Sequence, residues 1–276
     1  MDPDHHVSRR AVDGRTGRIL GRRLVAFRCA AKCLMRQSSA EFRQLLFKAG
    51  RGAGLPLGLA EDLVTPICWL QVCGFPGDAE ALNALTALDE GRTAHKFPDL
   101  TVLAHGTNGT GSRLSAIYLA AVGCDALQMG WPHQDEEIGF FEVDSSLLLA
   151  AALVLAHRRL KTGLSLRVET KSYVLSNTPG GEVRCVEKEC RRESISVRSI
   201  ADVQLGLAKD LTDSASGVLL LDSVKEEKYH HICETDGLCA NPDSIHGLQS
   251  LADRLLVPES DRSLKFGAGA GIVDSD

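Results

Sequence analysis

One apolar segment constrains the fold of this chain more than any other feature. Residues Leu147–Ala156 form an unbroken run of ten apolar residues, and Asp144 or Ser145 can cap a helix that extends to about Leu160. A helix that is apolar on every side must be buried among other elements. The run is also shorter than the roughly 20 apolar residues that cross a bilayer. The sequence therefore predicts a buried central helix and no transmembrane helix.

Helical patterns fill the first third of the folded part. Ser38 and Glu41 have the spacing of a capping box at the start of a first helix. Pro56 is expected to open a second helix, in which Pro66 should introduce a kink. Asp78 is expected to cap a third helix. This part of the chain is predicted to be helical.

Strand patterns surround and follow the buried helix. The segment Asn177–Gly181 (N-T-P-G-G) supplies turn chemistry for a hairpin or meander. A last helix, capped by Asn241, is expected over Pro242–Leu256. The remaining strands are predicted at Ile138–Val143, Leu164–Val168, Val183–Cys185, Ile195–Val197 and Gly217–Val224. Helices followed by mostly consecutive strands favour an α+β fold, with a mostly antiparallel sheet packed against the buried helix and a C-terminal helix.

The charge of the chain is divided unevenly. Residues 1–39 hold nine basic and three acidic residues, whereas the remainder holds 22 basic and 33 acidic ones. We expect residues 1–39 to be a disordered basic leader in front of one α+β domain, residues 40–276. The Arg-rich, acid-free stretch from 14 to 39 also has features of a mitochondrial targeting peptide. The alternatives are a solvated tail or a chain that begins at Met35.

The composition excludes some partners and indicates a compartment. The acidic body of this chain, which has 13 aromatic residues in all, lacks the clustered Lys and Arg that bind nucleic acid. The nine cysteines are scattered, and the chain is large enough to fold without disulfide bonds, which favours reduced thiols inside a cell. We therefore expect a soluble intracellular protein that binds neither nucleic acid nor membrane. Its compartment is the cytoplasm, or the mitochondrion if the leader is a targeting peptide.

Three local motifs have possible chemical roles, each with a simpler interpretation. The segment His105–Ser112 (H-G-T-N-G-T-G-S) is a Gly-rich turn before a helix, but it matches no nucleotide-binding fingerprint. The pairs Glu136/Glu137 and Glu226/Glu227 lie in polar runs and are interpreted as solvated. A third group has zinc-ligand residue types but not the usual paired spacing, and is interpreted as a loop with incidental ligands: His230, His231, Cys233, Cys239 and His246.

Two separated segments resemble one family. Residues 41–70 (E-F-R-Q-L-L-F-K-A-G-R-G-A-G-L-P-L-G-L-A-E-D-L-V-T-P-I-C-W-L) and 267–276 (G-A-G-A-G-I-V-D-S-D) resemble the two ends of the family of domain of unknown function 3726. The resemblance implies a domain from about residue 36 to 276 and brings no established reaction. The motif A-G-x-P followed by an acidic helix is also similar to the opening helices of type-2 malate and L-lactate dehydrogenases. That similarity implies NAD(P)-dependent oxidation of a 2-hydroxy acid as a minor alternative.

The two Gly-rich ends suggest a shared cleft. Arg51 is the candidate anion-binding residue, and Glu61, Asp274 and Asp276 are candidate acids, bases or cation ligands. Five glycines would allow a ligand to approach the backbone closely: Gly52, Gly54, Gly267, Gly269 and Gly271. This hypothesis describes an enzyme or metabolite-binding protein of small-molecule metabolism. The alternative is a non-catalytic accessory or assembly protein in which the same motifs are structural. The sequence indicates no reaction, cofactor or oligomeric state.

Overall fold

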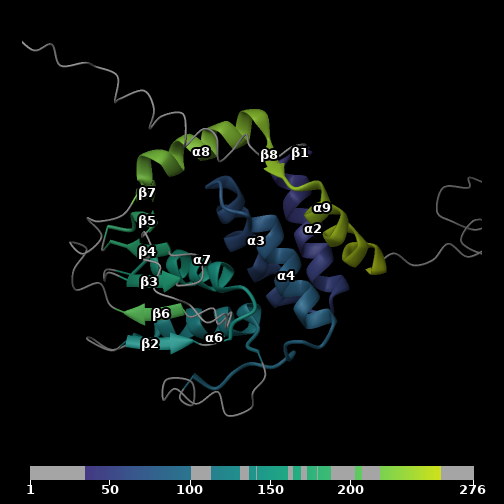
Figure 1. Cartoon of the computed structure of the whole chain (residues 1–276), viewed down its shortest axis with the longest axis horizontal. Helices are drawn as coiled ribbons and strands as arrows, with labels where there is room; N and C mark the ends of the chain where they lie inside the picture. The colour runs from purple at the N-terminus through teal and green to yellow at the C-terminus, as the bar shows by residue number, and fades with distance from the viewer. Residues whose placement is uncertain are drawn as a thin grey trace, which may run out of the picture. The chain divides into compact units, whose positions relative to one another are not determined.

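A computed structural model describes most of the chain after residue 34 (Figure 1). The described residues are 35–100, 113–130, 137–140, 142–160, 164–168, 173–178, 180–187, 203–206 and 218–255. The chain divides between Leu34 and Met35, and every described residue belongs to the second unit. Within that unit the elements form an α+β fold, as predicted.

Three helices open the fold: α2 (Ser39–Gly52), α3 (Leu57–Val72) and α4 (Gly77–Asp89). The predicted capping box of α2 is confirmed. Ser38 Oγ accepts a hydrogen bond from the Glu41 N–H at 3.2 Å, and the Glu41 carboxylate accepts one from the Ser38 N–H at 3.0 Å. Helix α3 follows Pro56 as predicted and continues through Pro66 to Val72. Local sequence patterns therefore set the N-terminal ends of α2 and α3.

The predicted cap of α4 is wrong. The helix begins at Gly77, and Asp78 lies inside its first turn, almost fully buried. The Asp78 carboxylate accepts hydrogen bonds from the backbone N–H groups of Ala79 and Asn241. Asp78 therefore links α4 to the residue that caps α9 (Pro242–Ala252), a contact that no local pattern indicates.

The fold begins before residue 40. Met35–Gln37 form strand β1, which pairs antiparallel with β8 (Leu238–Ala240). Ser38 caps α2, and Ser39 is its first residue. These five residues, assigned above to the leader, are part of the fold because β1 pairs with a strand about 200 residues later. Residues 1–34 lie outside the described part.

The second sheet is antiparallel throughout. Its strands are ordered β2-β6-β3-β4-β5-β7. The segment Asn177–Gly181 connects β4 to β5 as predicted, with Gly181 at φ +81° and a Thr178 N–H···O=C Glu182 bond of 3.0 Å. The strands are β2 (Glu137–Phe140), β3 (Leu164–Val168), β4 (Tyr173–Asn177), β5 (Val183–Glu187), β6 (Val203–Gly206) and β7 (Val218–Leu221).

Three predicted strands differ from the structure or lie outside it. The expected strand Gly217–Val224 is shorter, because β7 ends at Leu221 and Val224 lies in a helix. The expected strand Ile138–Val143 ends early, because β2 stops at Phe140 and Glu142 adopts a φ of +57°. Val143 then forms only an isolated bridge with Leu114. The segment Ile195–Val197 lies outside the described residues, and the alternation pattern did not identify β4.

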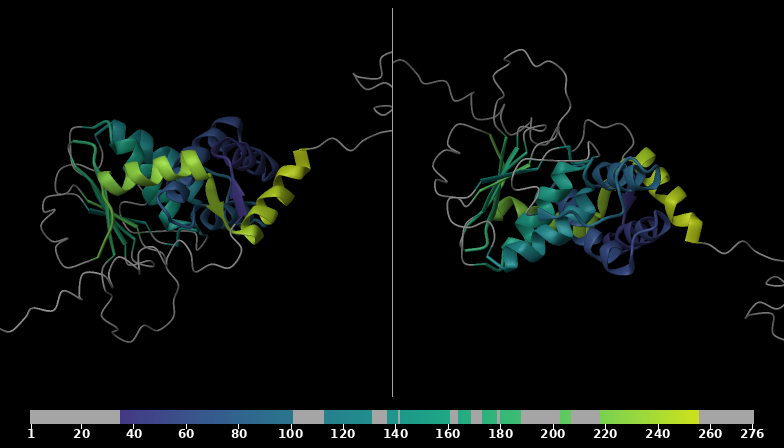
Figure 2. Two further views of the ribbon diagram at one scale, coloured as in Figure 1. Left: turned by 90° about the horizontal axis from the view of Figure 1, so that it is seen from above. Right: turned by 90° about the horizontal axis from the view of Figure 1, so that it is seen from below.

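The predicted buried helix is confirmed as α7 (Ser146–His157), with Ser145 at its N-cap. One side of α7 packs against strands β3, β4 and β6, and the other packs against α3, α4 and α6 (Ala116–Gln128). Figure 2 shows the sheet edge-on, with α6 and α7 between it and the N-terminal helices α2, α3 and α4. Helix α7 thus separates the sheet from the N-terminal helices, which is why all its faces are apolar.

Two more helices complete the described chain. Helix α9 has the predicted Asn241 cap and packs against α2 and α4. It leads into a short 3₁₀ turn, η3 (Asp253–Leu255). Helix α8 (Ser223–Asp236) was not predicted, because it buries only Glu226 and Cys233 and so lacks an apolar stripe. The burial of Glu226 also contradicts its predicted place on a solvated face. Among the described helices, none is both long and apolar enough to span a membrane.

Candidate functional site

The predicted site residues near α2 have structural roles in the described chain. Arg51 Nη1 donates a hydrogen bond to the Leu55 carbonyl at 2.5 Å, across the α2–α3 turn. Gly54 has a φ of +86° in this turn, and Glu61 lies exposed on α3. The tail residues Gly267, Gly269, Gly271, Asp274 and Asp276 lie outside the described residues. The shared cleft therefore stays a prediction.

The five zinc candidates do not lie in a loop. His230 and His231 are on α8, Cys233 is buried on the same helix, Cys239 belongs to β8, and His246 is exposed on α9. In the part of the chain that the structure describes, no three His, Cys, Asp or Glu side chains are grouped to hold a metal ion. The Gly-rich segment 105–112 lies outside that part.

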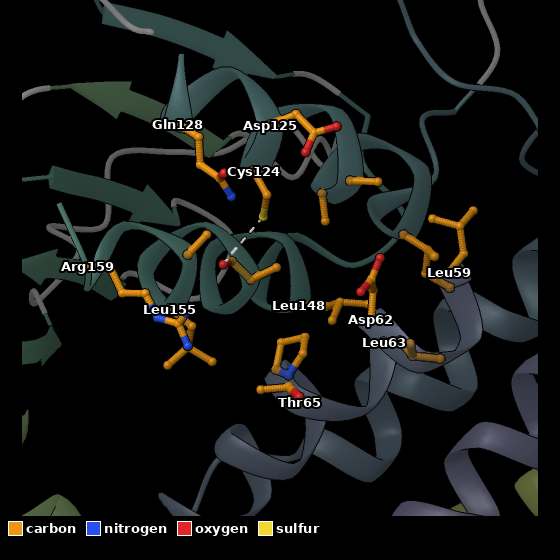
Figure 3. Close-up of a pocket in the computed structure, with 16 residues that line it drawn as sticks. Leu59, Asp62, Leu63, Thr65, Cys124, Asp125, Gln128, Leu148, Leu155 and Arg159 are labelled. Carbon is orange, nitrogen blue, oxygen red and sulfur yellow. Dashed lines mark hydrogen bonds between the residues drawn. The ribbon is translucent and has the colours of Figure 1, made fainter. Parts of the chain in front are cut away.

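A cavity of about 430 Å³ lies between α3, α6 and α7 (Figure 3). None of the residues predicted as site residues lines it. Its apolar wall includes Leu59, Leu63, Pro66, Ile117, Leu148 and Leu155. The sequence assigned these residues to helices but gave no sign that they surround a space.

Small side chains explain why the three helices leave this space. Helices α6 and α7 approach closely at Gly123, where an added Cβ would lie 2.8 Å from Leu153 Cδ2. Around this contact, four alanines face the cavity: Ala120 and Ala121 from α6, and Ala152 and Ala156 from α7. Larger side chains at these positions would fill the space. Alanines four residues apart on α7 are the sequence signal that could have identified it.

Polar groups stand around the cavity, with opposite charges at different ends. In Figure 3, Arg159 and Asp62 lie at opposite ends, and Gln128 and Asp125 lie along α6 between them, with Gln128 nearer to Arg159. Thr65 adds a hydroxyl from α3. Within the described residues, the side chains of Asp62, Asp125 and Arg159 form no ion pair or hydrogen bond. All three residues are exposed in the folded chain.

Cys124 is the one sulfur-bearing residue among the described lining residues. It is half-buried on α6, and its Sγ donates a hydrogen bond to the Ala152 carbonyl at 3.7 Å. Burial raises the pKa of the thiol to about 12, and the negative charges of Asp125 and Asp62 act in the same direction. The thiol is therefore protonated at neutral pH, and it lies within electrostatic range of both carboxylates.

Comparison with known proteins identifies the N-terminal part. Residues 37–110 match the family model described as "Protein of unknown function (DUF3726)". The similarity to this family is limited to these residues. The match includes α2, α3 and α4, so it contains the α3 side of the cavity. It does not include α6, α7 or the C-terminal segment 267–276. No curated protein and no solved structure matches the chain.

A second polar cluster lies where α6 and α7 begin. Asp144 is almost fully buried, and its Oδ1 accepts a hydrogen bond from the Ala116 N–H at 2.8 Å. Thr93 Oγ1 lies 3.5 Å from its Oδ2. Burial raises the pKa of Asp144 to about 6, although hydrogen bonds from Ala116, Ser145 and Thr93 and the charge of Arg113 oppose the increase. The ionised carboxylate is therefore costly to the folded state.

Replacing Asp144 with asparagine is expected to stabilise the protein at high pH. The folded-state pKa of about 6 lies above the ordinary 3.8, so the folded state binds more protons between these values. Wild-type stability should therefore fall as pH rises from about 4 to 6 and then level off. The side-chain amide in Asp144→Asn keeps an oxygen for the Ala116 N–H without the charge, so the variant should gain about 2 kcal/mol at pH 8 and little at pH 4.

Urea denaturation at pH 4, 6 and 8 measures the stability of both proteins. The free energy of unfolding of the wild type is expected to fall between pH 4 and 8, and that of Asp144→Asn is expected to fall less. Parallel pH profiles for the two proteins would contradict a raised pKa at Asp144.

Proposed function

We propose that this protein binds a small metabolite in the cavity between α3, α6 and α7. The cavity volume of about 430 Å³ falls within the range of roughly 300–1,000 Å³ that ligand pockets occupy. Its wall combines apolar side chains with polar and charged groups in about equal measure, so it can contact both apolar and polar parts of a ligand. The observation that carries the proposal is that these groups include unpaired charges of both signs within the described structure.

The described lining favours recognition as the main task of the cavity. Asp62, Asp125, Gln128 and Arg159 supply fixed charges and hydrogen-bonding groups around an apolar floor. The Cys124 thiol, with its pKa raised to about 12, is almost entirely in its non-nucleophilic form at neutral pH. These groups therefore support metabolite binding better than catalysis.

Filling the cavity should abolish metabolite binding. A thermal-shift screen of the wild type is expected to find ligands that raise the melting temperature, because a ligand that binds only the folded state stabilises it by mass action. Ala152→Leu places a larger side chain on the cavity wall and should remove these shifts. The screen includes nicotinamide cofactors, which tests the 2-hydroxy acid oxidoreductase alternative, and divalent metals.

Ala40→Leu is the matched control, because Ala40 is exposed in the first turn of α2, away from the cavity. It should keep every shift that the wild type shows. Shifts that persist in Ala152→Leu would place the ligand elsewhere, and a screen without shifts in the wild type would contradict metabolite binding.

A second candidate function, an accessory or assembly role, is favoured by one observation. Strand β7 ends the described strand order, and it exposes 51% of Val218 and 39% of Leu219. Val224, at the start of α8, is 73% exposed. Neighbouring exposed apolar residues at a sheet edge are typical of protein contacts. Light scattering on the full chain separates the two roles, since assembly requires a mass above that of one chain.

A further inference from the structure

The two aspartates at one end of the cavity belong to different helices. Asp62 on α3 and Asp125 on α6 both lie within electrostatic range of the Cys124 thiol, so their carboxylates approach the same region. Figure 3 shows Asp62 at the end opposite Arg159, and Asp125 on α6 between Asp62 and Gln128. Neither carboxylate has a cationic partner within the described residues. This end of the cavity therefore carries two negative charges.

Pro66 adds a backbone acceptor to the same end. Proline has no N–H, so the carbonyl of Asp62, four residues earlier in α3, does not receive its regular helical hydrogen bond. Residues four apart share a helix face, and Asp62 and Pro66 both line the cavity. An ammonium group has three donors and no acceptor, and it matches a region that offers two carboxylates and a carbonyl without its regular helical hydrogen bond.

The opposite end offers donors. Arg159 follows the last turn of α7, and its guanidinium has donors in a planar arrangement that fits a carboxylate. Gln128 of α6 lies beside this end in Figure 3 and adds an amide. Between the two ends, the surface is formed by Leu148, Ala152 and other apolar side chains. The cavity thus separates an acceptor-rich end from a donor-rich end by an apolar stretch.

We infer that the ligand is a zwitterion whose amine and carboxylate are separated by an apolar segment, as in an ω-amino acid or a short peptide. This inference rests on the proposed function. The amine lies against Asp62 and Asp125, and the carboxylate lies against Arg159. An α-amino acid carries both groups on one carbon atom, so it reaches only one end. A simple amine or a simple carboxylate satisfies one end and leaves the other without a partner.

Four probes of similar length test the inference by titration calorimetry: 6-aminohexanoate, hexylamine, hexanoate and norleucine. The first is expected to bind the full chain at least about tenfold more tightly than the other three, because each charged hydrogen-bonded contact contributes about a factor of ten or more. Equal affinity for 6-aminohexanoate and either singly charged probe would overturn the inference, as would tighter binding of norleucine.

Two variants test which end of the cavity binds the amine and which end binds the carboxylate. Asp125→Asn should weaken binding of 6-aminohexanoate and hexylamine and leave hexanoate unchanged. Arg159→Gln should weaken binding of 6-aminohexanoate and hexanoate and leave hexylamine unchanged. Glu227→Gln, at an exposed position on α8, removes one negative charge as Asp125→Asn does, so it controls for that change in net charge and should alter none of the affinities. Variants that weaken all probes equally would contradict the assigned ends.

The outcomes also separate this inference from the proposed function. If none of the four probes binds, but the screen finds a metabolite that Ala152→Leu no longer binds, the cavity is a ligand site and the zwitterion inference is wrong. If Ala152→Leu retains all binding that the wild type shows, the proposed function itself is wrong.

Discussion

Replacing Gly52 with alanine is expected to lower the free energy of unfolding by about 3 kcal/mol. A Cβ at residue 52 would lie 1.9 Å from the carbonyl oxygen and 2.7 Å from the carbonyl carbon of Leu251. Both atoms are backbone, so they cannot rotate away, and α2 and α9 would have to separate. Overpacking of this kind costs about 1–3 kcal/mol or more. We expect the upper end because a whole helix must move.

Gly58→Ala is the matched control for this substitution. Gly58 lies in the first turn of α3, and an added Cβ would meet nothing within 4 Å. Alanine has a higher helix propensity than glycine, so this variant should gain up to about 1 kcal/mol. Urea denaturation of both variants measures the difference. Wild-type stability of Gly52→Ala would contradict the close approach of α2 and α9.

Replacing Glu226 with alanine is expected to cost about 3 kcal/mol. Glu226 is 7% exposed, although the sequence placed it on a solvated face. It accepts hydrogen bonds from Trp69 Nε1 at 2.7 Å and from Arg158 Nη2 at 2.5 Å. The truncation leaves a buried indole N–H and a guanidinium without their acceptor, a loss of about 3–5 kcal/mol in fully buried pairs. Arg158 is partly exposed, so solvent reduces the loss.

Glu227→Ala provides the control at the neighbouring position. Glu227 is exposed, and its replacement should change stability by no more than about 0.5 kcal/mol. A double-mutant cycle with Arg158→Met should show a coupling of about 1–3 kcal/mol between residues 158 and 226. Equal effects of the two glutamate variants in urea denaturation would contradict the buried network.

Elements with local signals were predictable from the sequence. The Ser38–Glu41 capping box, the Asn241 cap and the turn at Asn177–Gly181 each depend on neighbouring residues. Helix α7 was predictable because its apolar surface has no polar side, which only a buried position permits. These signals were enough to establish an α+β fold.

Features that depend on distant residues were not predictable. Nothing local distinguishes Glu226 from Glu227, because the burial of Glu226 results from Trp69 and Arg158, each more than 60 residues away. Pairing of β1 with β8 and the bond between Asp78 and Asn241 have the same origin. Helix α8 lacks an apolar stripe, so its Asp222 cap was the only local indication.

The candidate site illustrates the same limit of local patterns. Asp62 and Asp125 are exposed residues of two different helices, and only the packing of α3 and α6 brings them to one cavity. The sequence predicts an irregularity of α3 at Pro66. It also shows that Asp62 lies four residues before this proline. Arg159 lies opposite Asp62 only because α7 packs against both α3 and α6, which no local pattern predicts.

The most direct test of the cavity as a ligand site is a comparison of dissociation constants. The metabolite with the largest thermal shift is titrated calorimetrically into the wild type, Ala152→Leu and Ala40→Leu. We predict that Ala152→Leu binds at least about tenfold more weakly than the wild type, whereas Ala40→Leu binds equally well. Equal dissociation constants for all three proteins would contradict binding between α3, α6 and α7.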